Sequence, residues 1–234
     1  MPEEVNRIVS DHLSDLLFCP TEAAMTNLAL EGLGQRARLT GDVMFDAMRV
    51  FGGLDQERGG ALAEAYPKDS FALATLHRAA NTDDPERLRR ILGAIDETAR
   101  TVCPVVMPMH PRTAARLASM AWHPAAISVV APLSYLDMLL LEMRARFILT
   151  DSGGVQKEAY FAKTPCITLR DETEWVETLH DNCNVLVGSD ADRILSAVAA
   201  TPAAGPWSAA YGDGDAGAKM AQALMQDCSD FPFR

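Results

Sequence analysis

The sequence predicts an α/β protein built on a doubly wound parallel sheet. Two observations favour this fold class. From Phe71 onward, short apolar runs alternate with segments that have helical periodicity. The apolar runs are nearly continuous, as expected for strands that are covered by helices on both faces. We therefore interpret residues 66–234 as a complete Rossmann-like domain.

The first part of the chain has fewer strands. The expected elements are a helix over residues 1–14, a strand over Asp15–Cys19, a helix over Glu22–Leu33 capped by Thr21, and a helix over residues 43–51. One clear strand is too little for an independent Rossmann-type unit. The Gly-rich, charged stretch from Gly52 to Gly60 is typical of a linker. We interpret residues 1–65 as the remnant of an N-terminal domain with its linker.

The second part supplies the predicted sheet. Strands are expected over Phe71–Leu76, Val105–Met109, Ile127–Val130, Phe147–Thr150, Cys166–Leu169 and Val185–Val187. Helices are expected over Asp83–Arg100, Arg112–Met120, Tyr135–Arg144, Val155–Lys163, Glu174–Leu179, Ala191–Ala200 and Lys219–Met225.

Composition excludes several classes of function. The net charge of −11 disfavours non-specific nucleic-acid binding, which depends on Lys and Arg against phosphates. No apolar run approaches the ~18 residues of a membrane helix, and we expect neither a signal peptide nor a membrane partner. The five cysteines are scattered without a CxxC pair, which argues against a metal site or a disulfide framework and favours the cytoplasm.

The most informative motif follows the strand that ends at Thr150. Asp151-Ser152-Gly153-Gly154 forms a tight turn before a helix. Glycines allow a ligand to approach the backbone, and the free N–H groups of a helix start favour an anion. Glu158, one helical turn later, is placed to bind the two hydroxyls of a ribose. The alternative is an ordinary strand–turn–helix whose glycines serve only the turn.

Three other polar stretches follow predicted strands. They are His77-Arg78, His110-Pro111-Arg112 and the run from Arg170 to Trp175. Each stretch also has an interpretation without a ligand: a histidine that is hydrogen-bonded within the protein, or a loop exposed to solvent. The carboxyl ends of parallel strands share one edge of a sheet, so all four stretches are expected to meet at one cleft. There His77 and Arg78 are candidates to contact phosphate or sugar, and Arg170 belongs to a nucleotide rim.

At the level of whole phrases the chain resembles the non-hydrolysing UDP-N-acetylglucosamine 2-epimerase family. The phrases are PEEVNR at 2–7, SDLLFCPTE at 14–22, GDVMFDAM at 41–48, TLHRAANTDDPERL at 75–88, PLSYLDML at 132–139, TDSGGVQKEAYFAKTPCITLRDETEWVET at 150–178 and YGDGDAGAK at 211–219. The motifs at 41–48 and 150–178 are most similar to those of the branch that acts on UDP-2,3-diacetamido-2,3-dideoxy-glucuronate.

This resemblance implies a glycosyltransferase-B-like fold and specific residue roles. It implies that Ser152, Gly153 and Gly154 hold the UDP diphosphate, that Glu158 binds the ribose, and that His77 and Glu3 belong to the catalytic set. The implied reaction inverts C2 of a UDP-2-acetamido sugar by elimination and re-addition of UDP, and no cofactor is implied. The implied partners are the UDP-sugar and either a second copy of the chain or a separately encoded N-terminal half.

Three departures from the family pattern keep other interpretations open. The chain starts at the PEE phrase, so we expect the N-terminal nucleotide-fold half, with most of the catalytic acids, to be absent. Ala80 stands where the family has Glu, which bears on regulation by a second UDP-sugar, and Trp175 stands where several relatives have Arg. The alternatives are a truncated, inactive UDP-binding homologue, an interaction subunit, and a glycosyltransferase of the same fold. PEEVNR and HRAANTDDPERL argue against the last.

Overall fold

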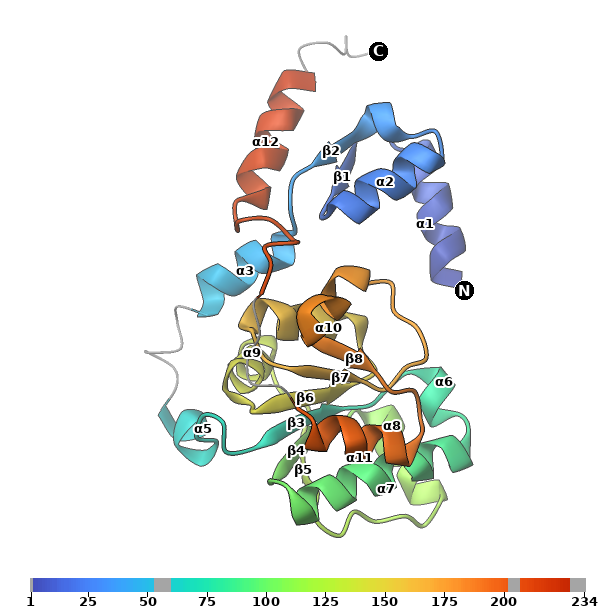
Figure 1. Ribbon diagram of the computed structural model, residues 1–234, viewed down its shortest axis with the longest axis vertical. Helices are drawn as coiled ribbons and strands as arrows, with labels where there is room; N and C mark the ends of the chain where they lie inside the picture. The colour runs from blue at the N-terminus through green and yellow to red at the C-terminus, as the bar shows by residue number, and fades with distance from the viewer. Residues whose placement is uncertain (1, 53–59, 202–206, 228–234) are drawn as a thin grey trace. The chain divides into compact units, whose positions relative to one another are not determined.

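The computed structural model describes residues 2–52, 60–201 and 207–227 (Figure 1). The chain divides into two compact units. Unit 1 comprises Met1–Val50 and Ser208–Arg234, and unit 2 comprises Phe51–Trp207. The predicted domain boundary between residues 65 and 66 stays a prediction.

Unit 2 is built on a six-stranded parallel sheet, as the sequence predicts. Its strands are β3 (Ala72–Thr75), β4 (Val105–Pro108), β5 (Ser128–Val130), β6 (Phe147–Thr150), β7 (Cys166–Thr168) and β8 (Asn184–Leu186). Their order across the sheet is β5-β4-β3-β6-β7-β8, and all neighbours are parallel. The strand order reverses between β3 and β6, and open α/β sheets bind ligands outside the carboxyl ends of the strands at such a point.

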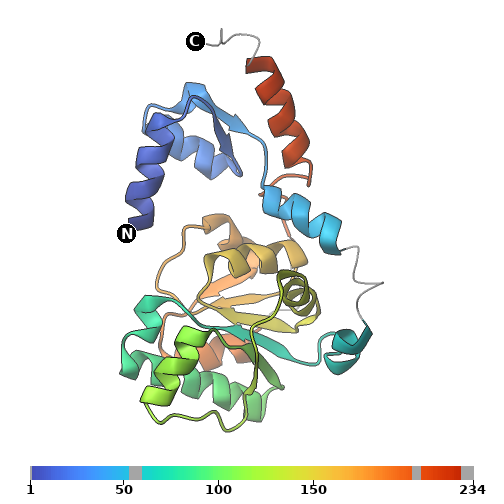
Figure 2. The same cartoon turned by 180° about the vertical axis from the view of Figure 1, so that it is seen from behind.

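Helices cover both faces of this sheet. Alternate side chains of β3 point to opposite faces, so that Ala72 and Ala74 pack in one core cluster and Leu73 in the other. Figures 1 and 2 show α7 (Pro85–Thr101), α8 (Pro111–Ser119) and α11 (Ala191–Ala199) on one side, and α9 (Tyr135–Arg144) and α10 (Gly153–Ala162) on the other. The remaining elements are the short helices α5 (Gly60–Ala65) and α6 (Ala79–Thr82) and the 3-10 segment η2 (Val176–Asn182).

Side-chain caps explain where several helices begin. Asp84 accepts hydrogen bonds from the backbone N–H groups of Glu86 and Arg87, with Pro85 in the first turn of α7. Ser134, Ser152 and Asp190 cap α9, α10 and α11 in the same way. These caps satisfy N–H groups that the helix itself leaves free.

Unit 1 contains α1 (Pro2–Leu13), β1 (Leu17–Cys19), α2 (Glu22–Leu30), the 3-10 turn η1 (Gly34–Arg36), β2 (Ala37–Leu39), α3 (Val43–Gly52, whose last residues lie in unit 2) and α12 (Ala216–Asp227). The prediction of a single strand before residue 60 was wrong, because β2 pairs in parallel with β1. Only Ala37 of its three residues is buried, so β2 has little apolar signal in the sequence.

The stretch interpreted as a linker is partly helical, because α5 begins at Gly60. Residues 53–59 of that stretch lie outside the described residues. Within the described part of the chain, no helix has the length and apolar character required to cross a membrane.

Candidate functional site

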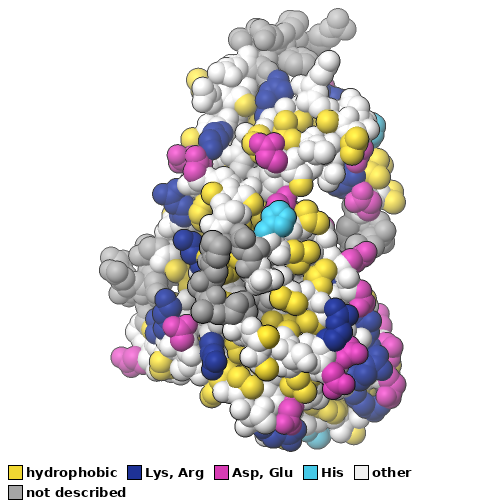
Figure 3. Space-filling view, in the orientation of Figure 1, with side chains coloured by type: hydrophobic (Ala, Val, Ile, Leu, Met, Phe, Trp, Pro, Cys, Tyr) yellow, Lys and Arg dark blue, Asp and Glu magenta, His cyan; other side chains and the backbone are white. Residues whose placement is uncertain are grey.

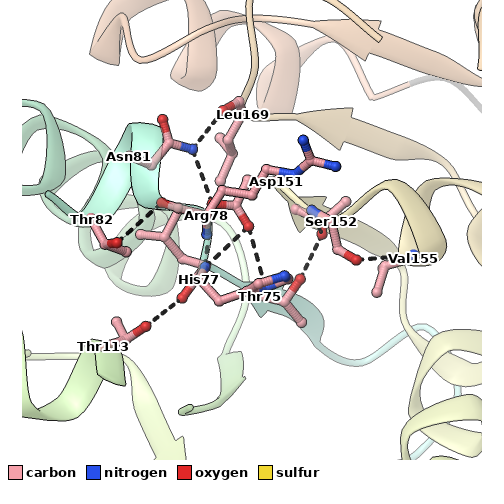
Figure 4. A network of polar contacts seen from close by, with 12 residues as sticks. Thr75, His77, Arg78, Asn81, Thr82, Thr113, Asp151, Ser152, Val155 and Leu169 are labelled. Carbon is pink, nitrogen blue, oxygen red and sulfur yellow. Dashed lines mark hydrogen bonds and ion pairs between the residues drawn. The ribbon is translucent and has the colours of Figure 1, made fainter. Parts of the chain in front are cut away.

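The candidate site lies at the carboxyl ends of β3 and β6, the two central strands. Thr75 and Thr150 end these strands in register, and their hydroxyl oxygens lie 2.6 Å apart. The loops that follow, Leu76–Arg78 and Asp151–Ser152, are therefore side by side (Figure 4). Residues separated by about 75 positions in the sequence are brought together by this strand order.

Asp151 joins the two loops. Its carboxylate is fully buried and accepts hydrogen bonds from the backbone N–H groups of His77 at 3.1 Å and Arg78 at 3.0 Å (Figure 4). The Asn81 side-chain amide donates to the same carboxylate at 3.0 Å and to the Leu169 carbonyl at 2.9 Å. Three donors thus stabilise the buried charge, and the loops after β3, β6 and β7 are tied into one frame.

His77 is oriented by the same carboxylate. Its Nδ1 lies 3.5 Å from Asp151 Oδ1, while 44% of the side chain is exposed. At this ion-pair distance the ring lies with Nδ1 toward the carboxylate, so Nε2 is the nitrogen on the far side of the ring, where a ligand could contact it. A histidine held in this way can accept or donate a proton at a fixed position.

The Ser152-Gly153-Gly154 segment, which the sequence predicts as an anion site, forms the N-terminus of α10. The Ser152 hydroxyl accepts a hydrogen bond from the Val155 N–H at 3.4 Å as the N-cap. A Cβ on Gly153 would lie 2.7 Å from Glu174 Oε1 and 3.0 Å from Trp175 Nε1, so only glycine fits there unless these side chains move. A Cβ on Gly154 would meet nothing nearer than the Ser152 hydroxyl at 3.8 Å. Gly154 therefore leaves open space at the helix start.

Two arginines meet at one carboxylate beside this turn. Glu174 pairs with Arg170 Nη2 at 2.8 Å and with Arg78 Nη2 at 3.4 Å. Burial is the largest single influence and acts to raise the pKa of Glu174, but the hydrogen bond from Arg170, a backbone hydrogen bond and the charges of Arg170 and Arg78 together place that pKa below its usual value. Arg170 is itself buried, and its Nη1 has no hydrogen-bond partner among the described residues. These groups are complementary to an anion with several oxygens.

Trp175 is paired with a cation from α10. The Lys157 ammonium lies 4.2 Å from the centre of the Trp175 ring, within the range of a cation–π contact. Lys157 thus supplies a positive charge in the vicinity of Trp175.

Glu158 lies deeper than the turn. It is buried on α10, one helical turn after Gly154, and the Tyr135 hydroxyl donates a hydrogen bond to it. Burial raises the pKa of Glu158, while nearby Lys157, Glu142 and Tyr135 act in the opposite direction. Glu142, on α9, is a second carboxyl group in contact with Glu158, and sequence reasoning gave it no role.

The structure gathers most of the predicted site residues in unit 2. Seven of them come from the carboxyl edge of the sheet or from the adjoining helix α10. They are His77, Arg78, Ser152, Gly153, Gly154, Glu158 and Arg170. Glu3 lies on α1 of unit 1. Sequence reasoning assigned no role to Asp151 or Asn81, although an Asp directly after a buried strand and beside Ser-Gly-Gly was a signal.

Charges elsewhere on unit 2 are mixed in sign. On the face drawn in Figure 3, Lys and Arg side chains alternate with Asp and Glu over the lower part of the molecule. No group of three or more His, Cys, Asp or Glu side chains with metal-binding geometry occurs among residues 2–52, 60–201 and 207–227.

The chain is similar in sequence to proteins of known function. The sequence model described as UDP-N-acetylglucosamine 2-epimerase matches residues 1–225. A UDP-2,3-diacetamido-2,3-dideoxy-D-glucuronate 2-epimerase from Pseudomonas aeruginosa is 46% identical over 198 residues, which are 83% of this chain and 54% of that protein. A UDP-N-acetylglucosamine 2-epimerase homolog from Methanococcus maripaludis is 40% identical over 232 residues, 96% of this chain and 64% of that protein.

A solved structure is similar over almost the whole chain. The crystal structure of Methanocaldococcus jannaschii UDP-GlcNAc 2-epimerase in complex with UDP-GlcNAc and UDP superposes with a TM-score of 0.88 at 36% identity, covering 97% of this chain and 65% of that one. The chain thus spans between about half and two thirds of the length of these relatives. The match confirms the predicted glycosyltransferase-B-like α/β fold.

Proposed function

The chain belongs to the UDP-N-acetylglucosamine 2-epimerase family, and from this premise we propose that unit 2 binds a UDP-sugar at the carboxyl edge of its sheet. We further propose that the protein acts in the inversion of C2 of that sugar. The observation that carries the proposal is the meeting of Arg78 and Arg170 at the N-terminus of α10. Two guanidinium groups and free helix N–H groups together favour a diphosphate.

In this proposal each part of the nucleotide has its own residues. Gly153 and Gly154 present backbone N–H groups to the diphosphate, Ser152 adds its hydroxyl because its own N–H donates to Thr150, and Arg78 and Arg170 lie beside them. Glu158 accepts hydrogen bonds from the ribose hydroxyls. The buried position of Glu158, behind an open turn, supports a contact with an uncharged sugar rather than with bulk water.

The proposed chemistry needs proton transfer and a retained leaving group. A base removes the proton from C2, the C1–O bond breaks, and UDP leaves with the electron pair to give a glycal. UDP then returns to C1 while C2 is protonated on its other face. His77, oriented by Asp151, and Glu3 are proposed for these proton transfers. The site holds UDP by the contacts above, so that re-addition competes with escape.

The substrate class is a UDP-2-acetamido sugar, of which UDP-GlcNAc and UDP-2,3-diacetamido-2,3-dideoxy-glucuronate are the two candidates. As partner we propose either a second copy of the chain or a separately encoded N-terminal half. A nucleotide-sugar substrate, and cysteines that form no disulfide within the described part of the chain, support a place in the reducing cytoplasm.

Binding is tested by calorimetry with UDP. Gly154→Val places a branched side chain in the open space at the start of α10 and should abolish binding. Gly93→Val is the matched control, because Gly93 is an exposed helical glycine of α7 with open space around it. Equal UDP affinity in Gly154→Val and the unsubstituted chain, at unchanged melting temperature, would place the nucleotide elsewhere.

Catalysis is tested separately by deuterium incorporation at C2 in D₂O, with both candidate UDP-sugars. The 234-residue chain is assayed alone and together with the N-terminal half of a full-length relative. Deuterium exchange at C2 in either assay, if it is lost when Glu3 or His77 is substituted, supports the proposed epimerase activity. UDP binding without exchange in both assays would favour the alternative of an inactive UDP-binding homologue.

A further inference from the structure

A second carboxyl group is buried behind Glu158. Glu142 lies on α9 with its side chain fully enclosed, at 0% exposure. Neither of its carboxyl oxygens has an N–H or O–H donor among the described residues. An ionised carboxylate in that position would be strongly unfavourable, because burial removes its hydration without replacing it.

The groups that face Glu142 come from three elements. Glu158 lies on α10 in hydrogen-bond contact with it, and the Tyr135 hydroxyl of α9 contacts the same Glu158. Lys157 of α10 interacts with Glu158, and the Cys166 thiol of β7 lies near Glu142. The cation therefore favours the ionised form of Glu158 rather than that of Glu142.

Two carboxyl groups in contact within a protein interior share a proton, since two like charges there repel strongly. The proton belongs on the more enclosed of the two. Burial, and then the charge of Glu158, raise the pKa of Glu142 well above its ordinary value. Glu158 has the Tyr135 hydroxyl and Lys157 to stabilise its charge, so Glu142 is the donor and Glu158 the acceptor.

We propose that Glu142 is a positioning residue that stays protonated and donates a hydrogen bond to Glu158, which holds the Glu158 carboxylate in place for the ligand. The pairing of the two carboxyl groups is a property of the protein without ligand. Its effect on nucleotide affinity rests on the proposed function. A purely structural role for Glu142 would change stability but would leave the pH dependence of nucleotide affinity unaltered.

The pairing is tested first in the ligand-free protein. Carboxyl groups of ¹³C-labelled Glu are titrated by NMR in the unsubstituted chain, Glu142→Gln and Glu158→Gln, with Glu64→Gln as control because Glu64 is exposed on α5. We expect a carboxyl signal that titrates far above 4.5, the ordinary pKa, and that disappears in Glu142→Gln. If every Glu carboxyl titrates near its ordinary pKa, the inference is wrong.

The functional consequence is tested with UDP by calorimetry, one pH unit below and one above that titration. Affinity of the unsubstituted chain should fall by about tenfold across the transition, since a hydrogen bond to a charged group is lost. Glu142→Gln keeps a donor at every pH and should show no such fall. The protonation of UDP itself is common to both proteins and cancels in the comparison.

Glu142→Leu is the third variant, and it tests whether the donated hydrogen bond is required for UDP affinity. It removes the donor without leaving a buried polar group, so it should fold and bind UDP about tenfold more weakly at the lower pH. Unaltered affinity in a folded Glu142→Leu, or an identical pH profile in Glu142→Gln, would overturn the positioning role. If the unsubstituted chain binds no UDP, the proposed function fails, while the ligand-free titration still decides the pairing.

Discussion

The buried carboxylate of Asp151 accepts a hydrogen bond from the backbone N–H of His77 at 3.1 Å and lies 3.5 Å from its ring Nδ1. One side chain therefore fixes both the backbone of the loop after β3 and the orientation of its histidine. The loop carries Arg78 as well, so the position of the cation proposed to bind phosphate depends on the same carboxylate. A buried acid thus sets the geometry of the proposed ligand site.

Asp151→Asn should destabilise the protein and weaken UDP binding. An amide presents one acceptor oxygen where the carboxylate presents two, and its NH₂ would face N–H donors. Each buried donor left unsatisfied costs about 1–3 kcal/mol. Urea denaturation and calorimetry measure both effects. Asp192→Asn, an exposed substitution on α11, should change neither, and equal stability of the two variants would contradict the anchoring role.

Glu174→Gln should bind inorganic pyrophosphate and UDP more tightly than the unsubstituted chain. The Glu174 carboxylate engages both guanidinium groups that a diphosphate would use, and the ligand must break these ion pairs. The neutral amide competes less, so an increase of about two- to tenfold is expected. Weaker binding in Glu174→Gln would mean that Glu174 orients the arginines instead of competing for them.

The fold was predictable where local pattern and packing agree. The limits of β6 and α9 were predicted to the residue, because the apolar run of β6 and the helical periodicity of α9 are clear in the sequence. β2 was missed because pairing with β1, rather than its own composition, makes it a strand. The helix expected over Glu174–Leu179 is instead the 3-10 segment η2, which starts two residues later.

The meeting of the loops after β3, β6 and β7 was predictable from the rule for parallel strands, but the contacts within the candidate site were not. The Ser-Gly-Gly turn is visible in the sequence because glycine and strand end occur together. The Asp151 anchor depends on β3 lying beside β6, which the local pattern does not specify. Glu142 looks like one more charged residue in an amphipathic helix, and only the packing of α9 against α10 encloses it.

Unit 1 should promote self-association. Val5, Val9 and Leu13 lie four residues apart on α1, with exposures of 61%, 53% and 80%, so they form an exposed apolar stripe. Sedimentation velocity should reveal association that increases with concentration. The double substitution Val9→Lys and Leu13→Lys should abolish it, while Met225→Lys on α12 should not. A chain that remains monomeric at all concentrations would contradict this prediction.

Glu142→Leu should gain stability relative to the unsubstituted chain as the pH rises. The folded protein raises the pKa of Glu142 above its unfolded value near 4.5, so folding favours the protonated form. The stability this contributes is complete below 4.5 and is lost as the pH rises through the folded pKa, by up to about 1.4 kcal/mol per pH unit. Urea unfolding at pH 5, 7 and 9 measures the difference, and Glu64→Gln should run parallel to the unsubstituted chain.

Glu158→Ala should weaken UDP and UDP-sugar alike. If Glu158 binds the ribose, it contacts a part of the ligand that both molecules share. A hydrogen-bonded charged group is worth roughly 1.5–3 kcal/mol, which corresponds to a loss of about 10–100-fold in affinity. Calorimetry with UDP and the UDP-sugar measures these losses. Inorganic pyrophosphate is the control ligand, because it has no ribose and should bind Glu158→Ala as tightly as it binds the unsubstituted chain. A loss confined to the UDP-sugar would instead place Glu158 at the sugar that undergoes reaction.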